Sequence, residues 1–282
     1  MINELFGSFL ALAGGFVWGS GDFFGGQASR RAQALHVAVF GALTGIAALL
    51  VLVVVFAEGV PDARSFVLGC ASGVFGLLGL TALYHGFVLG ATSVVAPIST
   101  VLAQAIPVVY AAIFQGIPGS WKLVGFVLAL IGCVLVARSD SDIGNQAKLA
   151  ISIRQGVLSG IGFGGFLICI AETSSAHVFG SLAAGRFAMV VLALLLIYGR
   201  GGRLEAVALS VPTMLSGMLD VGGNVLFLIA RQFTRLDAAV VLGSLYPIAT
   251  ILLSRLILKE RVASVQWLGI AVCTVAVGLI VS

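Results

Sequence analysis

The sequence has very little charge for its length. Of its 282 residues, 9% are Asp, Glu, Lys or Arg and 60% are apolar, whereas about 25% of the residues in soluble domains are charged. So few charges cannot cover the surface of a water-soluble fold of this size, and the mean hydropathy is +1.17. These figures exclude a soluble enzyme, a secreted disulfide module, a disordered chain and a nucleic-acid-binding domain. They predict a polytopic membrane protein.

Motifs of enzymes and metal sites are also missing. The cysteines Cys70, Cys133, Cys169 and Cys273 fall within apolar stretches and lack the CxxC spacing of zinc and redox sites, so we expect packing residues. There is no HExxH, Walker A or GxSxG motif, and the GxGxxG pattern at Gly160–Gly165 has no strand before it. We therefore expect no metal, no cofactor and no catalytic residue, and ATP-driven transport would need another subunit.

Ten apolar stretches are long enough to cross a bilayer as helices, which takes about 20 residues. They cover residues 6–26, 35–57, 66–88, 91–115, 121–137, 155–171, 178–198, 208–230, 238–258 and 264–281. We predict an all-α integral membrane protein with ten transmembrane helices. The first stretch follows Asn3 and Glu4 instead of basic residues and has no Ala-x-Ala site after it, so we expect a membrane helix and not a signal peptide.

Basic residues are distributed unequally between the two faces that ten spans would create. The face with both termini holds four: Arg64, Lys122, Arg231 and Arg235. The other face holds ten: Arg30, Arg31, Arg138, Lys148, Arg154, Arg200, Arg203, Arg255, Lys259 and Arg261. Because basic loops remain cytoplasmic, both termini are predicted to be non-cytoplasmic. The expected location is the cell membrane, and specifically a bacterial inner membrane.

The chain divides into two similar halves. The polar stretch 139–154 lies near the middle, with five apolar stretches on each side. An odd number of spans per half makes the second half insert in the opposite orientation. We therefore predict two inverted five-helix repeats, 1–138 and 155–282, joined by a linker at 139–154. Residues of the first half align with residues of the second half in the same order: Gly73 with Gly217, Gly76 with Asp220, and Pro107 with Pro247.

Short motifs follow one another along the whole chain: Trp18-Gly19-Ser20-Gly21-Asp22, Ser93-Val94-Val95-Ala96-Pro97, Ser244-Leu245-Tyr246-Pro247, Lys259-Glu260-Arg261 and Gln266-Trp267-Leu268-Gly269. In this order the sequence resembles the EamA-type members of the drug/metabolite transporter superfamily. It departs from them at residues 115–118, where many relatives have an acidic-basic pair, so we do not expect that pair to be essential here. The resemblance implies a central cavity lined by spans 1, 3, 4, 6, 8 and 9, and transport of small metabolites such as amino acids.

Charged residues within apolar stretches are the first candidates for a transport site, because they cost about 2.5–3.5 kcal/mol on insertion scales unless paired or hydrated. Asp220 and Asn224 are four residues apart on one helical face, and we predict that they bind substrate or a proton. The alternative is a structural hydrogen bond between helices. Arg186 is the natural counter-charge. We expect it to form a structural pair with Asp220, the alternative being that it holds a substrate carboxylate.

Further candidates lie nearer to the ends of the stretches. Asp22 and Glu172 occupy equivalent ends of the first and sixth stretches and are predicted to act in gating or in binding near an entrance, with a solvated helix end as the alternative. His85 could titrate near neutral pH and couple transport to protons, or it could simply anchor the helix. Side chains expected to line the cavity, with packing as the alternative, are Trp18, Tyr84, Gln104 and Tyr246.

Pro97, Pro107 and Pro247 each remove a backbone donor, so we expect them to bend helices where these line a cavity. Taken together, the sequence predicts a secondary transporter that exports small metabolites such as amino acids by alternating access, driven by protons or by the substrate gradient. The alternatives are uptake, movement of a lipid-linked sugar, a membrane enzyme, and a non-transporting assembly subunit. The expected partners are a small-molecule substrate and the lipid bilayer, without nucleic acid and without a required oligomer.

Overall fold

The computed structural model describes residues 2–29, 31–88, 92–137, 146–257 and 263–281, and all regular structure in these ranges is helical. The helices, with one short 3-10 turn, are α1 Ile2–Ser29, α2 Ala34–Val55, α3 Ala63–Val88, α4 Thr92–Gln115, α5 Ser120–Ala137, α6 Gln146–Ala171, α7 Val178–Gly199, η1 Ala206–Ala208, α8 Val211–Ala230, α9 Leu236–Gly243, α10 Tyr246–Ile257 and α11 Ser264–Val281. Helix α6 starts well before its apolar stretch, so residues 146–154, expected to be linker, are helical.

Within the described residues, six helices are long and apolar enough to cross a membrane by length and composition. The qualifying segments are Ala34–Val55, Ala63–Leu83, Ile98–Gln115, Ala150–Ala171, Val178–Gly199 and Val211–Ala230. Helices α5 and α11 carry shorter apolar segments, while α1 is long but rich in glycine and polar residues. The prediction of an all-helical, multi-pass membrane protein is confirmed, and the count of ten crossings stays a prediction.

The stretch 238–258, predicted to form a membrane helix with a bend at Pro247, is interrupted completely. The chain forms two helices, α9 and α10, separated by Ser244 and Leu245. Pro247 has no N–H to donate to the carbonyl of Gly243. Around this point the N–H groups of Leu245 and Ile248 donate to carbonyls only three residues back, at 3.3 and 3.0 Å. Helix α4, in contrast, runs without interruption through its two prolines, so bends there stay predictions.

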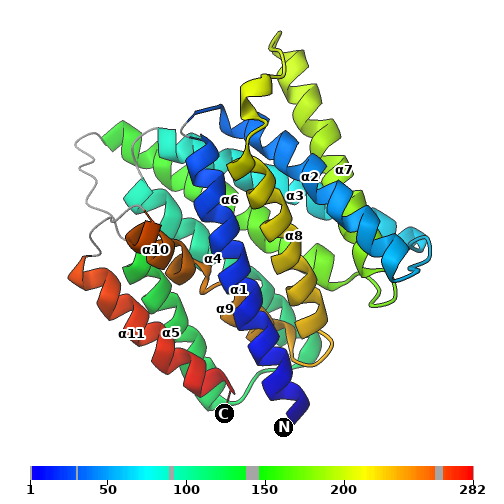
Figure 1. Cartoon of the computed structure of the whole chain (residues 1–282). Helices are drawn as coiled ribbons and strands as arrows, with labels where there is room; N and C mark the ends of the chain where they lie inside the picture. Colours follow the sequence, from blue (N-terminus) through cyan, green and yellow to red (C-terminus); the bar gives the residue numbers. More distant parts are fainter. Residues whose placement is uncertain (1, 30, 89–91, 138–145, 258–262, 282) are drawn as a thin grey trace.

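The helices form one bundle in which partners from the two halves of the chain lie side by side. Helix α1 packs along α8 and α3 along α6, while α2 contacts both α7 and α8 (Figure 1). Helix α4 packs against α6 and α9, and α5 pairs with α11 at one edge. Both termini lie at the same end of the bundle, which we call the terminal end; the far ends of α1 and α7 lie at the opposite end (Figure 1).

Glycines allow the central helices to cross in backbone contact. A Cβ atom on Gly73 of α3 would overlap the carbonyl oxygen of Gly185 on α7. In the same way, a Cβ atom on Gly217 of α8 would overlap the carbonyl oxygen of Gly41 on α2. Such close approach is typical of helix packing within membranes, where small residues replace the hydrophobic drive for association.

These crossings predict that adding a single methyl group lowers the free energy of unfolding at some glycines and not at others. Gly73→Ala and Gly217→Ala should destabilise the protein by about 1–3 kcal/mol, because the neighbouring backbone cannot move without shifting a helix. Gly278→Ala on α11 is the matched control, because open space surrounds that position and alanine favours a helix by about 1 kcal/mol. Thermal unfolding in detergent measures all three. Equal melting temperatures for the three variants would contradict the packing described.

Candidate functional site

The structure brings together three of the side chains predicted to form the transport site. The guanidinium Nη2 of Arg186 on α7 forms an ion pair with Oδ2 of Asp220 on α8. Asn224, one turn further along α8, donates from Nδ2 to the backbone carbonyl of Asp220 at 2.7 Å and to its Oδ2 at 3.2 Å. Opposite charges that pair within a span remove most of the cost of burying either one alone.

Glycines on neighbouring helices make room for this cluster. The Arg186 stem lies against Gly45 of α2, where a Cβ atom would sit 4.0 Å from Arg186 Cδ and 2.9 Å from Val221 Cγ2. On the other side, a Cβ atom on Gly21 of α1 would lie 3.3 Å from the backbone nitrogen of Asp220. The close helix crossings therefore decide where the two charges meet.

One hydrogen-bonding atom in the cluster is unused. Asn224 is 1% exposed, and its Oδ1 atom accepts no hydrogen bond from any residue that the structure describes. A buried acceptor without a donor costs about 1–3 kcal/mol. The side chain of Asp220 remains 39% exposed and that of Arg186 15% exposed. The cluster thus offers a cationic group, an accessible anionic group and a free acceptor, and could hold a small ligand with complementary groups.

A second group of polar side chains surrounds the link between α9 and α10. The Cys133 thiol of α5 donates to the carbonyl oxygen of Ser244 at 3.5 Å, and the Tyr246 side chain lies near Thr100 of α4. Gln104 is 1% exposed, and neither of its amide atoms has a hydrogen-bond partner among the described residues. The sequence analysis did not identify Cys133 and Thr100 here, because no local sequence pattern indicates which backbone carbonyls lose their intrahelical hydrogen bond where a helix is interrupted.

Among the described residues, the remaining candidates form no hydrogen bond or ion pair with the Asp220 cluster. Trp18 packs between α1 and α8, with its ring against Gly223 and its centroid 5.7 Å from that of Phe227. Asp22 on α1 and His85 on α3 are both exposed. The side chains of Tyr84, Pro97 and Pro247 lie outside the described part of the chain.

Glu172 forms ion pairs with residues of other helices at the terminal end. Its carboxylate pairs with Arg64 at the start of α3 at 3.3 Å and with Arg231 at the end of α8 at 3.4 Å. Arg231 also donates to the carbonyl of Ala171 at 3.1 Å, and Tyr110 of α4 lies close to Glu172. The Glu172 carboxylate therefore connects α3 and α8 to the end of α6.

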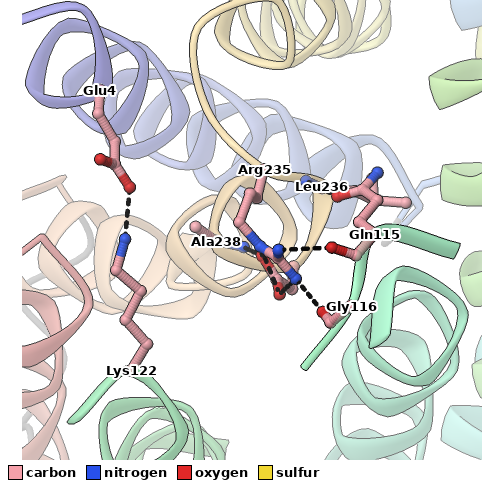
Figure 2. A network of polar contacts seen from close by, with 8 residues as sticks. Glu4, Gln115, Gly116, Lys122, Arg235, Leu236 and Ala238 are labelled. Atoms are coloured by element: carbon pink, nitrogen blue, oxygen red, sulfur yellow. Dashed lines mark hydrogen bonds and ion pairs between the residues drawn. The ribbon is translucent and has the colours of Figure 1, made fainter. Parts of the chain in front are cut away.

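A neighbouring network joins α4 to α9 at the same end (Figure 2). Arg235 donates to the carbonyl of Gln115 at 2.9 Å and to that of Gly116, and it pairs with Asp237 at 2.9 Å. Nearby, Lys122 of α5 forms an ion pair with Glu4 of α1 (Figure 2). Residues 115–118 thus replace the expected acidic-basic pair with backbone carbonyls that bind an arginine from the other half.

Two acidic side chains outside the helices accept hydrogen bonds from backbone N–H groups at the starts of α7 and α3, at the terminal end. Glu58 accepts the N–H groups of Phe179 and Gly180 at the start of α7, at 3.0 and 2.7 Å. Asp62 accepts the N–H of Ser65 at 3.2 Å, and hydrogen bonds from Ser65 hold the pKa of the Asp62 carboxyl below its usual value. Glu58 and Asp62 were not predicted, since Glu58 caps a helix that begins about 120 positions later.

A shallow hollow of about 530 Å³ lies beside the start of α5, lined by Gly119, Ser120, Trp121, Lys122 and Leu279. It contains none of the predicted transport residues. The Asp220 cluster, the α9–α10 link and the terminal-end networks are therefore the parts of the described structure with chemistry suited to transport.

Comparisons with known proteins agree with this picture. Residues 150–282 match the EamA-like transporter family, which confirms the resemblance seen in the sequence. An uncharacterized transporter of Synechocystis sp. is 24% identical over 175 residues, which are 60% of this chain and 52% of that protein, so the match spans about half of its length. A crystal structure 11% identical in sequence superposes over 97% of both chains with a TM-score of 0.73 and shows the same fold. These findings support a membrane transporter in general.

Because Arg186 and Asp220 form an ion pair, we expect that removing both charges changes the stability of the protein by less than the sum of the two single changes. Asp220→Asn or Arg186→Gln alone leaves one unpaired charge within the span and should destabilise the protein by about 1–3 kcal/mol, less than for a fully buried pair because Asp220 is partly exposed. The double variant should be closer to the unchanged protein, since it leaves no charge. A double-mutant cycle on thermal unfolding in detergent measures the coupling. Simple additivity would show that the two groups do not interact.

Proposed function

We propose that this chain, whose residues 150–282 belong to the EamA-like transporter family, is a secondary transporter that exports small zwitterionic metabolites such as amino acids. The observation that carries the proposal is the Arg186–Asp220 pair, with the unused acceptor of Asn224 beside it. Both charges lie near the middle of their helices, where charged side chains in membrane proteins commonly mark the substrate pathway.

A zwitterion can exchange partners with this pair without leaving a charge uncompensated. Its carboxylate would bind the Arg186 guanidinium, which donates in a planar fork suited to carboxylates. Its ammonium group would bind the Asp220 carboxylate and the free Oδ1 of Asn224. A neutral sugar or an apolar compound could not separate the pair in this way, so the site favours a zwitterion over neutral and apolar compounds.

The packing of the helices supports two inverted repeats. Exchanging α1 with α6, α2 with α7, α3 with α8, α4 with α9–α10 and α5 with α11 leaves the main helix pairings unchanged. The crossing of Gly73 on Gly185 then corresponds to that of Gly217 on Gly41, and equivalent glycines lie 144 residues apart in both cases. This register does not place Pro107 on Pro247, which lie 140 residues apart.

The polar networks of the terminal end support alternating access. Arg64 and Tyr110 from the first half meet Glu172 and Arg231 from the second, and Arg235 reaches across to the end of α4. Separating the repeats at this end would require these contacts to break. With both termini non-cytoplasmic, as the distribution of basic residues suggests, the contacts would close the outer side of the pathway until the substrate is released.

The proposal predicts what accumulates in the medium around cells that overproduce the protein. Unchanged protein should release one or more zwitterionic compounds that are absent from the medium of empty-vector cells. Asp220→Asn should abolish this release because the ammonium group loses its partner. Asp62→Asn is the matched control, since it makes the same chemical change at an exposed carboxylate outside the helices. Metabolite profiling at equal membrane abundance measures all four samples.

Each outcome bears on a separate part of the proposal. Release by Asp220→Asn at the level of unchanged protein would contradict the site and leave export standing. Release of a compound without opposite charges would contradict the substrate class. Identical profiles for all samples would contradict export.

A further inference from the structure

Asp22 is a carboxylate within α1 that the fold leaves without a partner. No described residue forms an ion pair or a hydrogen bond with its carboxylate, although Asp22 lies well inside a helix of 28 residues. The side chain is nevertheless exposed. Arg186 on α7 is paired with Asp220 on α8 and not with Asp22. An ionised group in this position is costly unless water, a proton or a cation balances it.

The contacts of the glycines on the same helical face indicate where the Asp22 side chain points. Gly15 and Gly19 lie seven and three residues before it and therefore share its face. Gly15 abuts the carbonyl of Gly243, and Gly19 abuts that of Tyr246. Asp22 thus projects toward the α9–α10 link and not toward lipid.

Open space begins at this point of the bundle. A Cβ atom on Gly26, one turn after Asp22, would have nothing within 4 Å among the described residues. Helix α1 is therefore in backbone contact with α9 and α10 up to Gly19 and is no longer so at Gly26. The exposed carboxylate of Asp22 lies where this space begins, on the side toward the opposite end of the bundle.

The groups around Asp22 are suited to a proton. Tyr246 begins α10, and its carbonyl abuts Gly19 one turn before Asp22, so its phenol is a titratable group close to Asp22. Other titratable groups on the surrounding elements are Asp220 on α8, which Arg186 holds, and Cys133 on α5, which donates to Ser244. Of the basic side chains on the other helices that contact α1, Arg255 on α10 lies over the Trp267 ring of α11, 5.9 Å from its centroid, and His36 on α2 pairs with Glu205. Among the described residues neither forms an ion pair with Asp22, so the charge of Asp22 can change without breaking one.

We propose that Asp22 is the site at which the transporter binds its coupling proton. This inference rests on the proposed function and assigns coupling to Asp22, while Asp220 and Arg186 serve the substrate. A proton from water converts the carboxylate to a neutral carboxyl, and the same proton returns to water after the two ends have alternated. The neutral form allows α1 and α10 to approach in an apolar setting, whereas the ionised form requires the space to stay hydrated.

Labelling with dicyclohexylcarbodiimide tests proton binding without any substrate. This reagent attacks protonated carboxyl groups in apolar surroundings and leaves a stable N-acylurea. Purified protein should carry the adduct on the peptide containing Asp22, with higher yield at acidic than at alkaline pH, and Asp22→Asn should lose it. Asp62→Asn should label like the unchanged protein. Labelling of Asp220 instead of Asp22, or no labelling of either, would overturn the assignment.

Transport in proteoliposomes tests coupling, with a mixture of radiolabelled amino acids as the probe. Asp22→Asn should lose accumulation driven by an imposed pH gradient and keep exchange of external for internal amino acids. Asp22→Glu should retain both, because it keeps an ionisable carboxyl. Gradient-driven accumulation by Asp22→Asn, or its loss of exchange as well, would overturn the coupling role. Absence of exchange by the unchanged protein would instead contradict the proposed function, and the labelling experiment would still decide on Asp22.

Discussion

A charge placed within the membrane must be balanced, and this constraint organises the interior of the protein. Arg186 and Asp220 balance each other between α7 and α8, and Asn224 adds a hydrogen bond to the carboxylate. Asp22 has no such partner and lies beside open space. We propose, from this difference, that Asp220 exchanges its partner for a ligand of matching charge and that Asp22 gains and loses a proton.

Close contact between backbones makes this balance geometrically possible. The crossings at Gly73–Gly185 and Gly217–Gly41 bring α3 to α7 and α8 to α2, and Gly45 leaves room for the stem of Arg186. The same small residues leave few side chains to interlock across these helix pairs. The polar ties at the terminal end, centred on Glu172 and Arg235, connect the halves at positions where water is within reach. In the alternating access that we propose, these polar contacts break at one end while the central crossings hold.

Helix positions could be predicted closely from the sequence, because the length of an apolar stretch is set by the thickness of the bilayer. The stretches at 178–198 and 264–281 agree with α7 and α11 to within one residue. A bend at Pro247 was expected, but a complete division into α9 and α10 could not be predicted, since a proline interrupts a helix in one context and is tolerated in another. Pro107 stays within a continuous α4, whereas the chain turns just before Pro247.

The sequence by itself determined the class of protein, since 9% charged residues and long apolar stretches are compatible only with a lipid environment. It also identified Asp220, Asn224 and Arg186 as candidates, because each is polar within an apolar stretch. Only the tertiary structure decided that Arg186 pairs with Asp220 and that Glu172 pairs with Arg64 and Arg231. It also decided that Asp22 has no ion-pair partner among the described residues. The reason is that pairing depends on which helices cross and in what register, and these crossings join residues that lie far apart in the chain.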